Sequence, residues 1–120
     1  MLVDTSVWVD HFRKGNMRLA ELLNTTQVLM HPFVLGELCC GNLAKRAEVL
    51  GMLSDLPQIP VLEHDEVMDF VTAHRLYGRG LGWIDTHLLA SARLARVPVW
   101  TLDKRLAAAA LELSRPPVRT

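Results

Sequence analysis

The chain has 120 residues, half of them apolar, and its 13 basic and 13 acidic side chains balance to no net formal charge. This length suits one compact domain with a single core, so we expect one domain over residues 1–120. No apolar run reaches the roughly 20 residues of a membrane helix, and the N-terminus lacks a signal peptide's basic and apolar regions. These features argue against a membrane or secreted protein and predict a cytoplasmic one. The adjacent Cys39 and Cys40 are interpreted as small buried hydrophobic residues in a reducing compartment.

Short strands and helices alternate along the chain. Residues 2–4 predict a strand, 6–12 one or two helical turns, and 17–24 an amphipathic helix. Because proline is favoured in a first helical turn, Pro32 predicts a helix over 32–41. The remaining elements are expected in this order: helix 45–54, extended chain 57–65, helix 64–78 with acids in its first turn and basic residues in its last, a break at 78–83, helix 84–96, strand 97–102, helix 103–113, and a tail 114–120 with a last edge strand or no order.

Strands separated by helices imply crossover connections and a mostly parallel sheet, which is an α/β fold. In such sheets, ligands bind at the carboxyl ends of the strands, where each strand passes into a helix. Asp4 and Asp103 both lie at such junctions. The alternative interpretation of Asp4 is a helix N-cap, which needs no active site.

Two further acids begin or interrupt apolar helices. In the helix over 32–41, Glu37 has apolar neighbours three and four positions away, and Asp85 precedes Leu88 and Leu89 in the same way. A buried ion pair, or a side chain that reaches solvent, is the alternative for Glu37. For Asp85 the alternative is a first-turn acid favoured by the helix dipole.

Several buried and unpaired carboxylates are costly, so a positive group is expected among them. The sequence has no arginine cluster at these positions and no Cys or His spacing typical of zinc. Oxygen ligands favour hard cations such as Mg²⁺ or Mn²⁺. We therefore interpret Asp4 as a metal ligand that also caps a helix.

Four segments together resemble a PIN domain, specifically the VapC-type toxins of bacterial toxin-antitoxin pairs. They are "MLVDTSVWVD" with Asp4 and Ser6, "FVLGELCCG" with Glu37, "GLGWIDTHLLASARL" with Asp85, and "VWTLDKRL" with Asp103. Thr101 precedes the last acid as the family pattern expects. The resemblance covers essentially the whole chain and implies a three-layer fold with helices around a mostly parallel sheet.

The resemblance implies a Mg²⁺-dependent endoribonuclease in which Mn²⁺ can substitute. Asp4, Asp85 and Asp103 match the metal ligands, Glu37 matches a ligand of a second ion or a group that orients the water, and Ser6 matches the family's hydroxyl. A metal-activated water leaves a 5′-phosphate and a 3′-hydroxyl, whereas attack by the 2′-hydroxyl leaves a cyclic phosphate.

The implied partners are RNA, a cognate antitoxin and a second copy of the chain. The apolar helices 17–24 and 45–54 support a homodimer and a groove for an antitoxin peptide, which would bring a basic side chain near the acids. Candidate RNA contacts beside the strand ends are Arg13, Arg79, Trp83, Lys104 and Arg105.

Other interpretations remain at this point. A PIN nuclease of RNA processing, or a catalytically silent PIN module that only binds, would have the same fold. A phosphoacceptor receiver domain needs paired acids after its first strand and a lysine after its last, and this chain has neither. A haloacid-dehalogenase-like phosphatase needs Asp-x-Asp at the first strand, where residue 6 is Ser.

Overall fold

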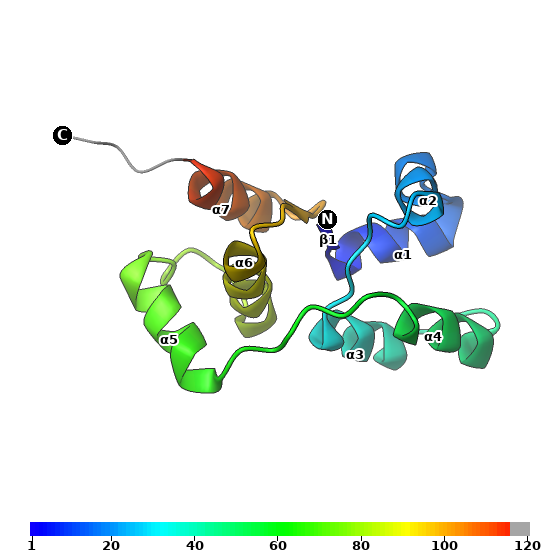
Figure 1. The fold of residues 1–120 in the computed structure, drawn as a ribbon, viewed down its shortest axis with the longest axis horizontal. Coiled ribbons are helices and arrows are strands. Elements are labelled where there is room, and N and C mark those ends of the chain that lie inside the picture. The colour runs from blue at the N-terminus through cyan, green and yellow to red at the C-terminus, as the bar shows by residue number, and fades with distance from the viewer. Residues whose placement is uncertain (116–120) are drawn as a thin grey trace.

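The structure is a computed structural model that describes residues 1–115 (Figure 1). Within this range the elements follow in this order: β1 Leu2–Val3, α1 Thr5–Lys14, α2 Met17–Asn24, α3 Pro32–Cys40, α4 Arg46–Ser54, α5 His64–Ala73, α6 Trp83–Ala95, β2 Val99–Trp100 and α7 Lys104–Ser114. No helix in the described range is long and apolar enough to cross a bilayer.

A small parallel sheet lies at the centre of the fold. β1 pairs with β2, with Leu2 opposite Val99. On the other side of β1, Leu29 forms a single parallel bridge to Leu2, and Met30 forms another to Gln58. The predicted α/β fold with a parallel sheet is confirmed, although helices make up most of the chain.

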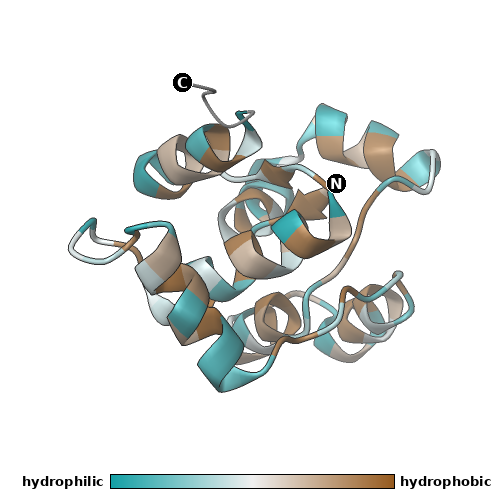
Figure 2. Cartoon of the chain, turned by 60° about the vertical axis from the view of Figure 1, so that its left-hand side comes forward, coloured by the Kyte–Doolittle hydropathy of each residue, from teal (hydrophilic) through white to brown (hydrophobic). Residues whose placement is uncertain are grey.

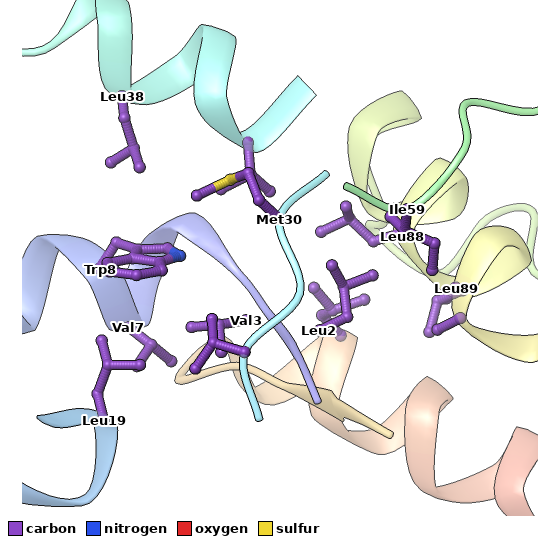
Figure 3. Close-up of a cluster of buried hydrophobic side chains, with 14 of the residues drawn as sticks. Leu2, Val3, Val7, Trp8, Leu19, Met30, Leu38, Ile59, Leu88 and Leu89 are labelled. Carbon is purple, nitrogen blue, oxygen red and sulfur yellow. The ribbon is translucent and has the colours of Figure 1, made fainter. Parts of the chain in front are cut away.

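The core packs on both sides of these strands. Leu2 and Val3 are fully buried, and they meet Trp8 of α1, Met30, and Leu88 of α6 (Figure 3). In Figure 2 the strands at the centre are mostly hydrophobic, whereas the surrounding helices mix hydrophobic and hydrophilic residues. β1 is therefore anchored from both faces, which fixes the position of Asp4 directly after it.

The central helix is α6, which packs against α5, α7 and β2 (Figure 1). Its residues 86–92 are all buried, so this stretch is covered on every side and not only along one stripe. α1 packs against α3, and α3 against α4, on the other side of the strands. Asp85, in the first turn of α6, is thus held by the most buried helix of the fold.

Several element boundaries differ from the predictions. α1 runs for ten residues, and the strand expected over 97–102 is regular only at Val99–Trp100. α5 ends at Ala73, with no basic residue in its last turn, so the basic end predicted for this helix is wrong. The chain turns there because Arg75 adopts a left-handed conformation, with φ of 53°. The predicted tail strand lies in a segment that extends beyond the described residues.

Candidate active site

Asp4 lies at the N-cap position of α1, but its carboxylate accepts no helix amide. The residue is 7 % exposed, and its Oδ2 accepts hydrogen bonds from Ser6 Oγ at 2.8 Å and Thr101 Oγ1 at 2.7 Å. The prediction that the side chain caps the helix is therefore wrong. Two hydroxyl donors, one of them from the end of the neighbouring strand, bind its Oδ2 instead.

Thr101 joins the ends of the two strands. Its Oγ1 donates to Asp4 and accepts the Asp103 amide at 3.0 Å, while the Leu102 amide donates to Ser6 Oγ, also at 3.0 Å. The sequence places Thr101 in the last motif without indicating this role. A hydroxyl residue between a strand end and an acid is the signal for it, because such a side chain reaches backbone groups two residues away.

Asp103 is the N-cap residue of α7, and Asp85 lies in the first turn of α6. Asp103 Oδ1 accepts the Leu106 amide at 2.9 Å at the N-terminus of α7, and Asp85 Oδ2 accepts the Gly82 amide at 2.9 Å at the N-terminus of α6. The dipole of each helix favours an acid at this position. The interpretation of Asp85 as a first-turn acid is thus correct for the local structure. In Asp85 and Asp103 alike, only one carboxylate oxygen takes part in this bonding.

The charges of three acids act on one another. Burial raises the pKa of the half-buried Asp85 carboxyl, and the negative charges of Asp4 and Asp103 raise it further, while the Gly82 amide opposes them. Asp4, which is 81 positions away in the sequence and follows β1, and Asp103, which is 18 positions away and follows β2, are thus close enough to Asp85 to influence its ionisation. These three acids therefore lie at the same end of the fold, and their role as ligands of one metal ion stays a prediction.

Glu37 is placed differently from the prediction. Val34 and Leu38 form the buried stripe of α3, whereas Glu37 is exposed and its Oε1 accepts a hydrogen bond from Thr5 Oγ1 at 2.7 Å. Of the neighbours three and four positions away, Val34 is buried, but Cys40 and Gly41 are exposed like Glu37, so this face of the helix is only partly covered. Because Thr5 directly follows Asp4, this bond still brings Glu37 to the same end of the fold.

The two cysteines are also placed differently. Cys39 and Cys40 are both exposed and free, so the prediction of buried hydrophobic residues is wrong. They follow the buried Leu38 in the last turn of α3, and each residue turns about 100° around the helix axis, which carries both away from the buried stripe. Arg46 contacts this turn by donating to the Cys39 carbonyl oxygen at 2.9 Å.

The four acids share one pattern of hydrogen bonding. Within residues 1–115, Asp4 Oδ1, Asp85 Oδ1, Asp103 Oδ2 and Glu37 Oε2 have no hydrogen-bond partner, while the other oxygen of each residue is bonded. No three His, Cys, Asp or Glu side chains of this range lie close enough together to hold one metal ion as they stand. Main-chain amides thus hold Asp85 and Asp103, side-chain hydroxyls hold Asp4 and Glu37, and one oxygen of each acid has no hydrogen-bond partner in this range.

The five candidate RNA contacts differ in their surroundings. Arg13 and Lys104 are exposed, and Arg13 lines a groove together with Thr5 and Glu37. Arg79 instead forms a two-bond ion pair with Glu112, at 2.7 and 3.2 Å.

Arg105 and Trp83 lie near the loop that precedes α6. The Arg105 side chain lies against Gly80, where a Cβ would clash with the guanidinium, and Gly80 has a φ of +77° that favours glycine. Trp83 is 40 % exposed, and its ring packs against His64 and His87 at centroid distances of 4.8 Å.

Comparison with known proteins agrees with this geometry. The PIN domain family model matches residues 1–112. Two curated relatives, both named Ribonuclease VapC32, come from Mycobacterium tuberculosis strains CDC 1551 / Oshkosh and ATCC 25618 / H37Rv. Each is 48% identical over 113 residues, which is 93% of this chain and 91% of the relative. The chain belongs to the PIN domain family, as a protein of the VapC ribonuclease type.

Proposed function

We propose that this protein is an endoribonuclease that uses a divalent cation, Mg²⁺ or Mn²⁺, and acts as the toxin of a toxin-antitoxin pair. The observation that carries the proposal is the group of acids at the strand ends, each with one oxygen free of hydrogen bonds within residues 1–115. Membership in the PIN family and the similarity to ribonucleases named VapC32 support the choice of RNA as substrate.

The residues present fit a hard cation. Their free oxygens are carboxylate oxygens, which Mg²⁺ and Mn²⁺ prefer. The pKa of Asp85 is raised first by burial and further by the negative charges of Asp4 and Asp103, and a bound cation would counteract both effects. Asp4, Asp85 and Asp103 would hold the ion, directly or through water. Glu37, attached through Thr5, would hold a second ion or orient the attacking water.

The other residues have positioning roles. Ser6 and Thr101 bind one oxygen of Asp4 and thereby fix the carboxylate while its other oxygen stays without a hydrogen-bond partner within residues 1–115. The Gly82 and Leu106 amides orient Asp85 and Asp103 in the same manner. When bound, the cation supplies an activated water and neutralises charge on the phosphodiester. Hydrolysis by water leaves a 5′-phosphate and a 3′-hydroxyl.

Cleavage of a single-stranded RNA tests the activity. EDTA should abolish cleavage, and Mg²⁺ or Mn²⁺ should restore it. Asp4→Asn, Asp85→Asn and Asp103→Asn should each lower kcat/KM by orders of magnitude, because Asn keeps the size of the side chain but loses the charge. The exposed Asp69→Asn on α5 is the matched control. Cyclic-phosphate products, or full activity in EDTA, would contradict the proposed mechanism.

The antitoxin site is proposed in a groove of about 480 Å³ beside Glu37. Its apolar lining comes from α1, from α3 and from the segment that leads into α4, and it includes Val9, Phe12, Leu43 and Val49. None of its lining residues belongs to α2, so among the two helices expected to form the groove only α4 contributes. An amphipathic helix fits such a groove, and Glu37 would pair with a basic side chain of the antitoxin.

Expression in bacteria tests the toxin role. Growth arrest that requires Asp4 and is relieved by the cognate antitoxin is the expected result. Cleavage without growth arrest would favour a nuclease of RNA processing, and absence of cleavage with retained RNA binding would favour a silent binding module. Light scattering on the purified protein tests the proposed homodimer, for which a strict monomer is the contradicting result.

A further inference from the structure

A second cleft lies between α5 and the N-terminus of α6. It has a volume of about 290 Å³ and is closed on one side by the loop 76–82. Its apolar and aromatic lining consists of Met68, Val71, Leu76, Tyr77, Leu81 and Trp83. This cleft is separate from the groove proposed for the antitoxin, which uses α1, α3 and α4.

Two aromatic side chains in this cleft are open to solvent. Tyr77 is 64 % exposed and Trp83 is 40 % exposed. Trp83 is nevertheless held in place, because His64 lies against it and His87 meets it edge to face with an interplanar angle of 89°. A fixed aromatic ring that keeps exposed area is suited to stacking against a flat partner.

The cleft is continuous with the candidate active site. Gly82 lines the cleft, and its amide donates to Asp85 Oδ2 at 2.9 Å. Trp83 precedes Asp85 by two residues. On the other side of the loop, Arg105 lies against Gly80 and follows Asp103 by two residues. An RNA strand bound at the acids would therefore reach the aromatic cleft, and the Arg105 guanidinium would lie beside its phosphates.

We infer that this cleft binds an unpaired base of the RNA substrate, next to the phosphodiester that is cleaved. The inference rests on the proposed nuclease function and adds a subsite to it. A base in a duplex is stacked on its neighbours, so only single-stranded or loop RNA supplies the occupant. The hydroxyls of Thr72 and Thr86, which line the cleft, already donate to carbonyl oxygens of their own helices. Selection at this subsite therefore follows stacking strength, with purines bound better than pyrimidines.

The test uses a set of hexamer RNAs of mixed sequence, in which each base in turn is replaced by an abasic site. Binding is measured by fluorescence anisotropy in EDTA, and kcat/KM is measured in Mg²⁺. For the wild-type protein, the abasic site at one position should weaken binding roughly five- to a hundredfold, the range expected for one stacked base. Replacement of a purine by a pyrimidine at that position should have a smaller effect in the same direction.

The variants connect this position to the cleft. Trp83→Ala and Tyr77→Ala should weaken binding of the intact hexamer, and the abasic site should then cause little further loss, because base and ring form one interaction. Trp83→Phe should restore part of the binding. Leu111→Ala, which alters an exposed apolar residue of α7 outside the cleft, is the control. Tyr77→Ala guards against misfolding, since its side chain is more exposed than that of Trp83.

The outcomes separate the two proposals. If the wild-type protein cleaves RNA and the abasic effect is unchanged in Trp83→Ala and Tyr77→Ala, the base subsite is wrong and the nuclease function stands. If either variant instead changes the oligomeric state in light scattering and leaves the abasic effect unchanged, the cleft contacts a second copy of the chain. If the wild-type protein neither binds nor cleaves RNA under any of these conditions, both proposals are overturned.

Discussion

The two carboxylate oxygens of each candidate acid differ in their surroundings. One oxygen accepts a hydrogen bond that holds the side chain in place, and the other has no protein partner within residues 1–115, in Asp4, Asp85, Asp103 and Glu37. A carboxylate that serves only as a helix cap gains nothing from burial near other acids, because the like charges repel. The pKa of Asp85 is raised mainly by its burial and additionally by the charges of Asp4 and Asp103. The arrangement is reasonable for a group of residues whose charge is balanced by a cation.

At the same scale, Asp85→Asn should stabilise the metal-free protein at neutral pH. The folded-state pKa of Asp85 is raised, so its penalty appears as pH rises from the ordinary carboxyl range through the raised value, and it is absent at lower pH. Because the side chain is only half-buried, we expect a gain in Tm of about 1 to 3 °C in EDTA at pH 7, which vanishes near pH 3.

Thermal unfolding in EDTA and in about 5 mM Mg²⁺ checks this prediction. Mg²⁺ should reverse the order, because a ligand that binds only the folded state stabilises it, and the variant binds the ion poorly. Asp69→Asn is again the control. Identical melting temperatures of wild type and Asp85→Asn in both buffers would leave Asp85 as a simple first-turn acid.

At the scale of single elements, the start of α3 contains a titratable group. His31 caps this helix through Nδ1, which accepts the Phe33 amide at 2.9 Å, and its buried Nε2 has no hydrogen-bond partner in the described range. Burial, and to a lesser degree His87, lowers the pKa of His31 to about 4. The His87 ring lies near His31, and the pKa of His87 is also lowered, by burial and by the charge of His64.

His31→Asn should therefore reduce the loss of stability in acid. Between about pH 6.5 and 4 the unfolded chain binds a proton that folded His31 does not, so the stability of the wild type falls as pH decreases through this range, by up to about 3 kcal/mol. Asn retains the cap, since it accepts helix amides about as well as the best capping residues.

Urea unfolding at pH 4.5 and 7.5 measures the effect. The difference in unfolding free energy between the two pH values should be smaller in His31→Asn than in the wild type, even if the variant is less stable overall. The exposed His64→Asn provides a comparison on α5. An unchanged pH dependence in His31→Asn would assign the acid sensitivity to other groups.

At the scale of the whole molecule, catalysis and inhibition are expected on neighbouring but separable surfaces. Val49 of α4 lines the proposed antitoxin groove, as Glu37 of α3 does, but it belongs to a different helix from each of the four acids. Val49→Asp should leave RNA cleavage near the wild-type rate and weaken inhibition by the antitoxin at least tenfold, because a buried unpaired charge is costly at such an interface.

Met52→Asp is the matched control for this prediction, since Met52 is on the same helix, is 66 % exposed and does not line the groove. Inhibition assays with increasing antitoxin give the measurement. Equal inhibition of wild type, Val49→Asp and Met52→Asp would move the antitoxin to another surface. Loss of cleavage in Val49→Asp alone would indicate that the groove is part of the catalytic fold.

Local sequence patterns determined the order of the elements and the positions of the acids. Pro32 begins α3 as predicted, and Asp4 and Asp103 each lie between a strand and a helix. These features depend on short-range rules, namely capping, proline geometry and the passage from strand to helix, so the chain's own neighbours suffice to predict them.

Only the tertiary structure decided which side chains are exposed and which distant residues they contact. The exposure of Glu37 and of both cysteines depends on which face of α3 meets α1, and the two hydroxyls on Asp4 come together because β1 and β2, separated by nearly the whole chain, lie side by side. The exposed rings of Tyr77 and Trp83 likewise share a cleft only because α5 packs against α6. These contacts are set by packing between segments that are distant in the sequence, and a local sequence pattern does not predict such packing.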